Sequence, residues 1–154
     1  MPNARRIAPV AALAVLTALT LSACGASAVT TEGGGLSVTV EKTGEVAIPA
    51  EFLESYPTKG SACVLDITIE NTSDDFIEIL STSISSESMG TVGIGNLEEM
   101  PGYGSFYDVL DDRDGLESGE QLVFTDSAAC IATDATMDVV APGGGTIVEV
   151  PLGL

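Results

Sequence analysis

Short runs that alternate between apolar and polar residues organise the chain from Leu36 to its end. An alternation with a period of two predicts a β-strand that buries one face. Residues 36–41 alternate in this way, and Gly44 then interrupts the pattern, so we expect residues 46–48 to continue after a turn or bulge. The clearest run is residues 63–70, whose apolar face consists of Cys63, Leu65, Ile67 and Ile69.

A second region, residues 76–84, has an irregular pattern. Phe76, Leu80 and Ile84 are offset from Ile77 and Ile79, so the alternation slips once. A β-bulge, which inserts one extra residue into a strand, would produce such a slip. Further short strands are predicted at residues 91–94, 106–110, 121–125, 129–133, 137–140 and 146–150.

Turn-forming residues separate these runs. Residues 71–74 (Asn-Thr-Ser-Asp) form a turn whose side chains can hydrogen-bond to their own backbone, and residues 142–145 (Pro-Gly-Gly-Gly) form a loop. About seven to nine short strands, with no convincing amphipathic helix, are typical of an all-β protein. We therefore predict an antiparallel, immunoglobulin-like β-sandwich over residues 36–154.

The beginning of the chain has a different composition. Arg5 and Arg6 precede an uncharged apolar run, residues 7–21, which suits a signal-peptide core and is too short for a comfortable membrane span. The run closes on Leu-Ser-Ala-Cys at residues 21–24, which resembles the lipobox of bacterial lipoproteins. The resemblance implies that residues 1–23 are removed as a signal peptide and that Cys24 receives a diacylglyceryl group.

Lipidation would hold the protein at a membrane. Each buried methylene group contributes about 0.8 kcal/mol, so two or more acyl chains such as palmitate retain a protein that one chain binds only marginally. The sequence thus predicts a lipoprotein on the extracytoplasmic face of the cell membrane. An ordinary secretory peptide cleaved before a cysteine is the alternative. Residues 24–35 are predicted to be the lipidated cysteine and a flexible linker, because they are small, polar and rich in glycine.

Charge restricts the partners. All 23 acidic residues follow the cleavage point, whereas only Lys42, Lys59 and Arg113 of the basic residues do, so the mature chain has a net charge of −20. Phosphates of nucleic acids require clusters of lysine and arginine, so we predict no nucleic-acid partner. Anionic lipid headgroups also repel such a surface, so we expect membrane contact through the anchor. An unidentified extracytoplasmic protein or ligand remains as the partner.

Three cysteines are present, and assigning Cys24 to lipid leaves Cys63 and Cys130 as a pair. In an oxidising compartment we predict that this pair forms a disulfide. Two free thiols are one alternative. A metal site is the other, but it needs further soft or imidazole ligands and the chain has no histidine. A bond from an early central strand to a late one is expected to tie the two sheets together.

Two further segments support a family resemblance. Residues 65–74 form a strand ending in Asn-Thr-Ser-Asp, and residues 116–120 (Leu-Glu-Ser-Gly-Glu) feed another strand at Val123 and Phe124. This arrangement is similar to the immunoglobulin-like domains of many bacterial surface lipoproteins. The resemblance covers about residues 36 to 150 and implies the sandwich fold. The family is mostly of unknown function, so it implies no functional residues.

An acidic turn offers the most suggestive local chemistry: Asp111, Asp112, Asp114 and Glu117. Calcium needs several oxygen ligands that converge at short distance. An EF-hand loop with Gly115 at its sixth place would put Leu110 first, where an aspartate is required, so that motif fails. A different calcium loop at these four residues is the alternative to a solvated acidic turn, and it would make the domain a cation-binding structural unit of the cell envelope.

Catalysis is not supported. Without histidine the usual arrangement of serine nucleophile and base cannot form. Asp126-Ser127-Ala128 resembles an aspartic-protease loop, but two such aspartates must share a proton and the chain holds one such loop. A carboxylate-based hydrolase is the least favoured alternative. We predict a non-enzymatic binding or interaction domain at the cell surface that needs no cofactor.

Overall fold

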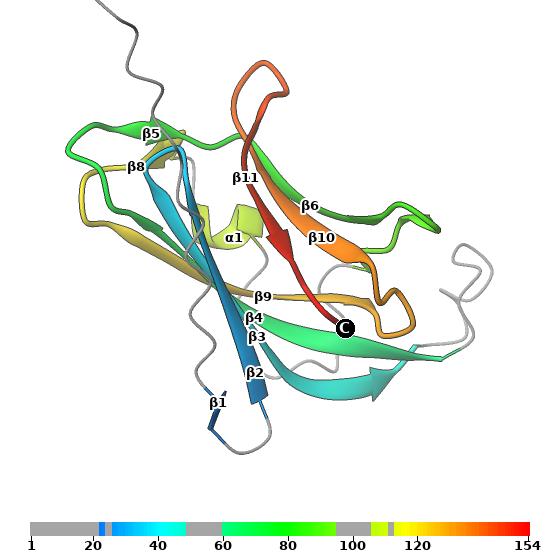
Figure 1. Ribbon diagram of the computed structural model, residues 1–154. Coiled ribbons are helices and arrows are strands. Elements are labelled where there is room, and N and C mark those ends of the chain that lie inside the picture. Colours follow the sequence, from blue (N-terminus) through cyan, green and yellow to red (C-terminus); the bar gives the residue numbers. More distant parts are fainter. Residues whose placement is uncertain (1–21, 24–25, 49–59, 95–105, 111–112) are drawn as a thin grey trace, which may run out of the picture.

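A computed structural model describes residues 22–23, 26–48, 60–94, 106–110 and 113–154. Most of these residues lie in β-strands (Figure 1). The elements in chain order are β1 (Ser22–Ala23), β2 (Ala26–Gly33), β3 (Leu36–Ala47), β4 (Ser61–Asn71), β5 (Ile77–Glu78), β6 (Ser81–Ser86), β7 (Gly90–Thr91), α1 (Phe106–Leu110), β8 (Gly115–Leu116), β9 (Gln121–Ala129), β10 (Ala135–Val140) and β11 (Thr146–Pro151).

The strands form two main antiparallel sheets, which confirms the predicted all-β sandwich. One sheet has the order β1-β2-β3-β4-β9, and the other has the order β11-β10-β6-β7 (Figure 1). The run β3-β4-β9 opposite β11-β10-β6 follows the chain order of strands A-B-E opposite G-F-C in an immunoglobulin-like sandwich. A third, two-stranded sheet pairs β5 with β8 at one end of the sandwich.

The core lies between the two main sheets, and the alternating strands supply it as predicted. Residues 63, 65, 67 and 69 of β4 are all buried, and so are Leu36, Val38 and Val40 of β3. The register of β3 against β4 shifts between Lys42 and Gly44, so the predicted interruption at Gly44 is a bulge within one continuous strand. The opposite sheet contributes Ile84, Met137, Val139, Val148 and Val150.

The predicted flexible linker is wrong over most of its length. Residues 26–33 form β2, which pairs with β3 from Ala28 opposite Glu41 to Gly33 opposite Leu36. Small and polar residues form a strand here because the already paired β3 offers a row of backbone donors and acceptors. Strand β2 therefore begins two residues after Cys24, which itself lies outside the described residues, and β1, just before Cys24, pairs with the start of β2.

Residues 76–84 do not form one bulged strand. The chain leaves the two-stranded sheet after β5 and enters the four-stranded sheet at β6, so Ile79 and Leu80 belong to neither. Ile79 donates its N–H to Asp114, whereas Leu80 donates to Val140 on the other side. The alternation slips because the chain crosses here from the two-stranded sheet to the four-stranded sheet. The predicted bulge is therefore wrong.

Two other predicted strands are also corrected. Residues 106–110 form the short helix α1, in which Phe106 and Leu110 share the buried face because they are four residues apart. The ring of Phe106 packs edge-on against Phe124 of β9 with centroids 5.5 Å apart. Residues 129–133 form the end of β9 and a turn, and residues 91–94 form strand only at Thr91, with a single bridge from Gly93 to Ala128.

The predicted turn at residues 71–74 is confirmed, and Asn71 is its centre. Its Oδ1 accepts hydrogen bonds from the backbone N–H (2.9 Å) and hydroxyl (2.8 Å) of Ser73. Its Nδ2 donates to the carbonyl oxygens of Asp75 (2.7 Å) and Leu116 (2.9 Å). Asn71 is fully buried, so one side chain joins the end of β4 to β8.

A second polar contact joins turns at the opposite end. Asp134 accepts hydrogen bonds from the Ser86 hydroxyl (2.6 Å) and the Ser88 backbone N–H (3.0 Å), and so connects the β6–β7 turn to the β9–β10 turn. The hydrogen bond from the Ser86 hydroxyl lowers the pKa of the Asp134 carboxyl group the most, and the hydrogen bond from the Ser88 N–H lowers it further.

Replacing Asp134 by asparagine should therefore lower stability at neutral pH and have no effect in acid. A carboxylate whose pKa is lowered in the folded state contributes stability above its unfolded pKa of about 3.9, and that contribution is lost as the pH falls through the folded pKa. Urea unfolding of Asp134→Asn and the unmodified protein at pH 7, and at or below about pH 3, measures the difference. Asp74→Asn, at an exposed aspartate, is the control. An equal loss of unfolding free energy in Asp134→Asn at both pH values would contradict the explanation that the charge of Asp134 stabilises the fold.

Candidate functional site

The cysteine pair is covalently joined. Cys63 and Cys130 form a disulfide with their Cα atoms 5.0 Å apart, as predicted. The bond does not tie the two sheets together, however. Cys63 lies on β4 opposite Ala128, and Cys130 directly follows β9, so the disulfide joins two neighbouring strands of the same sheet at its end.

A carboxylate lies beside this disulfide. Glu45 forms the one group of three potential metal ligands within the described residues, together with Cys63 and Cys130. The sulfurs are consumed by the disulfide, and Glu45 is bound by Lys42 Nζ (2.7 Å) and the Ser61 hydroxyl (3.1 Å). The hydrogen bonds from Lys42 and then Ser61 lower the pKa of Glu45. These contacts join β3 to the start of β4, and this group of three residues has no free ligand set for a metal.

Only half of the predicted acidic turn can be placed. Asp111 and Asp112 lie outside the described residues. Asp114 and Glu117 are exposed, and the described acidic residues near them form no group of three carboxylates close enough to share an ion. The Glu117 N–H donates to Glu120 (2.8 Å), which also pairs with Arg113 at 3.7 Å. The described part of the turn, residues 113–120, is thus held together by contacts among its own residues.

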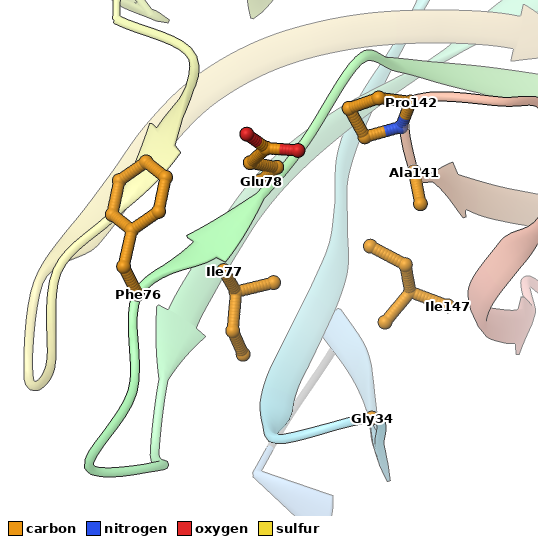
Figure 2. Close-up of a pocket in the computed structure, with 7 residues that line it drawn as sticks. All are labelled: Gly34, Phe76, Ile77, Glu78, Ala141, Pro142 and Ile147. Atoms are coloured by element: carbon orange, nitrogen blue, oxygen red, sulfur yellow. The ribbon is translucent and has the colours of Figure 1, made fainter.

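A shallow groove of about 530 Å³ lies at the end of the sandwich opposite the disulfide. We call it the β5 groove, and its lining residues are Gly34, Phe76, Ile77, Glu78, Ala141, Pro142 and Ile147. Figure 2 shows Ile77 and Ile147 on opposite sides of it, with Ala141 and Pro142 along one rim. The walls therefore come from β5 on one side and from the β10–β11 loop and the start of β11 on the other, and these two regions are far apart in the sequence.

The floor of the groove is the turn between β2 and β3, and it requires glycine. Gly34 and Gly35 have φ values of +56° and +84°, which favour residues without a Cβ atom. A Cβ atom at Gly34 would collide with the Ile147 side chain, and one at Gly35 would lie 2.9 Å from Ile77 Cδ1. The glycine turn thus lets both isoleucines approach the backbone and shape the groove.

The groove continues along β5 into a second depression of about 390 Å³, which shares Glu78 and Pro142 with it. Leu80, Leu110, Arg113 and Asp114 line this part. Phe76 is 46% exposed and Leu80 is 53% exposed. Two large apolar side chains on one edge of a groove are typical of a surface that meets a partner.

The sequence contained a signal for this surface. Alternate residues of an extended chain point to opposite faces, and residues 76–80 carry apolar side chains at both odd and even positions. They cannot all enter one core, so some of them face outward.

Within the described ranges no helix is long and apolar enough to cross a membrane. Comparison of the chain with protein-family models, with curated proteins and with solved structures finds no match.

Proposed function

We propose that this protein is a non-enzymatic, lipid-anchored binding domain on the extracytoplasmic face of the cell membrane, and that the β5 groove holds its partner. Cys24 carries the lipid in this proposal. The acidic body, with a net charge of −20 after cleavage, makes its contact with an anionic membrane through that lipid.

The observation that supports the proposal is the position of the groove relative to the start of β2, the strand that follows Cys24 in the chain. β2 begins at Ala26, close to Cys24, and runs to Gly33 beside the groove. Near the start of β2, Ala28 faces Glu41, which in turn faces Asp66 about midway along β4, whereas the groove lies at the end of the sheet that holds Asn71 and Gln121. A chain held at Cys24 thus presents its exposed apolar groove away from the membrane.

Replacing Cys24 by alanine tests the anchor. We expect the unmodified protein in the membrane fraction and Cys24→Ala in the soluble or secreted fraction, because the variant lacks the acyl chains that retain it. Mass spectrometry of the mature amino terminus should find diacylglycerol on Cys24 of the unmodified protein. A protein that stays in the membrane fraction without Cys24, or an unmodified cysteine, would overturn the anchor.

Photo-crosslinking tests the groove. Leu80 and Ile131 are exposed to the same degree, 53% and 52%, but lie at opposite ends of the sandwich. A photoreactive phenylalanine analogue at position 80 should give a discrete crosslinked product in intact cells, and the analogue at position 131 should not give that product. Identical products from both positions, or none from position 80, would contradict binding at the groove.

A further inference from the structure

We infer that the β5 groove takes an extended peptide segment, with apolar side chains and a lysine or arginine, that pairs with the open edge of β5. This inference rests on the proposed function and specifies the chemistry of the partner. It depends on three features of the groove: an unpaired backbone edge, apolar walls and a carboxylate rim.

The backbone edge follows from the hydrogen bonds around β5. Consecutive N–H groups of an extended chain point to opposite sides. Ile79 donates to Asp114 on the β8 side (2.9 Å), and Leu80 donates to Val140 on the β10 side (2.8 Å). By this alternation the N–H and C=O of Glu78 point toward the β10–β11 loop, which is the side of the groove. Glu78 faces Gly115 as the non-hydrogen-bonded pair of the β5–β8 ladder.

Neither backbone group of Glu78 has a partner within the described part of the chain. An open strand edge of this kind binds another extended chain by main-chain hydrogen bonds. The passage between the sheets creates the opening: the end of β10 bonds to Leu80, two residues after β5, and the chain then continues to Pro142, which lines the groove beside Glu78. A peptide that donates to and accepts from Glu78 would fill this space.

The walls select the side chains of the peptide. Ile77 and Ile147 reach into the groove from opposite sides (Figure 2). Pro142 lines both depressions. Phe76 directly precedes β5 and Leu80 lies two residues after it, and about half of each residue is exposed. Alternate side chains of an extended peptide point to one face, so apolar residues at every second position would meet these walls.

The rim selects the charge. Glu78 lines both depressions and Asp114 lines the second, and both residues are exposed. Arg113, the one basic residue in either lining, already donates to the carbonyl oxygens of Leu110 and Val109 at 3.1 Å and faces Glu120. The groove therefore presents uncompensated negative charge on a protein whose overall charge is also negative, which complements a basic peptide and repels an acidic one.

End-capped, fluorescent seven-residue peptides test this inference against the purified full-length protein in detergent. The probe alternates valine and threonine around a central lysine. One matched peptide carries glutamate instead of lysine, and another carries N-methyl groups on alternate backbone amides. We expect the lysine peptide to bind, and N-methylation to weaken binding about tenfold, because the methylated amide cannot donate to the Glu78 carbonyl oxygen and its methyl group keeps the peptide too far away to accept from the Glu78 N–H. The glutamate peptide should bind at least roughly threefold more weakly than the lysine peptide.

Variants of the protein place the peptide in the groove. Ala141→Trp, which fills the groove, should abolish binding, whereas Ile131→Trp at the opposite end should not change it. Glu78→Gln should reduce the preference for the lysine peptide over the glutamate peptide, and the fold should tolerate this change because residue 78 is exposed.

Equal binding of the N-methylated and unmodified peptides would overturn strand pairing. Failure of every peptide to bind, with the crosslink from position 80 intact, would overturn the peptide class and leave the proposed function standing; loss of that crosslink would overturn the proposed function itself.

Discussion

Replacing Cys63 and Cys130 together by alanine should lower the free energy of unfolding by about 4 kcal/mol. The two residues are 67 positions apart, so the disulfide closes a long loop in the unfolded chain and removes much of its conformational freedom. Within the folded sheet the bond adds little, because β4 and β9 are already paired from Ala62 to Glu70. The stabilisation therefore acts mainly on the unfolded state.

Urea unfolding with and without a reducing agent measures this effect. The slope of the unfolding free energy against urea concentration should rise when the bond is broken, because the uncrosslinked unfolded chain exposes more surface. The unmodified protein under reducing conditions should match the double variant. Cys24→Ala, which keeps the disulfide, should retain full stability and serves as the control. A loss below about 1 kcal/mol with an unchanged slope would contradict the loop-closure explanation.

Asn71→Ala should cost about 2 to 4 kcal/mol. The substitution removes all four hydrogen bonds of the Asn71 side chain and leaves the buried Leu116 carbonyl oxygen without its donor. A buried polar group without a partner carries the full cost of losing water, which exceeds the net value of an exposed hydrogen bond. The loss should therefore be one of the largest from any single polar side chain described in this fold.

Two companion variants separate the contributions. Thr72→Ala removes one exposed hydrogen bond, to the Gly35 carbonyl oxygen, and should cost no more than about 1 kcal/mol. Asn71→Asp keeps the acceptor for Ser73 but turns a carboxylate toward two carbonyl oxygens, so it should be destabilising at pH 7 and less so in acid, where the protonated group can donate. Urea unfolding at both pH values checks this. Equal losses for Asn71→Ala and Thr72→Ala would contradict the role of burial.

Prediction from the sequence succeeded where one face of a strand is buried. The alternation in β3 and β4 predicted both strands and the residues that face the core. Such a pattern is reliable because a shift of the strand register by one residue would place every apolar side chain in water. The interruption at Gly44, expected as a turn or a bulge, and the turn at Asn71 were also predicted, since both depend on local chemistry. That Asn71 is fully buried depends on the position of β8, which no local pattern reveals.

Prediction failed where distant partners decide the structure. Residues 26–33 have little apolar alternation of their own and are a strand because β3 lies beside them. Phe106 and Leu110 fit a strand or one helical turn equally well in so short a segment, and packing against Phe124 accompanies the helix. The β5 groove combines the chain near residue 77 with the β10–β11 loop, so its walls could not be paired from sequence.

The direction of β2 has a mechanical consequence. A protein held at Cys24 and pulled through a partner at the β5 groove would carry the load along the axis of β2, since that strand begins two residues after Cys24 in the chain and ends beside the groove. Such a force shears β2 against β3, and the six register pairs from Ala28–Glu41 to Gly33–Leu36 would resist together and would not open one at a time. The hairpin that replaces the expected linker would make the connection between surface and partner resistant to tension.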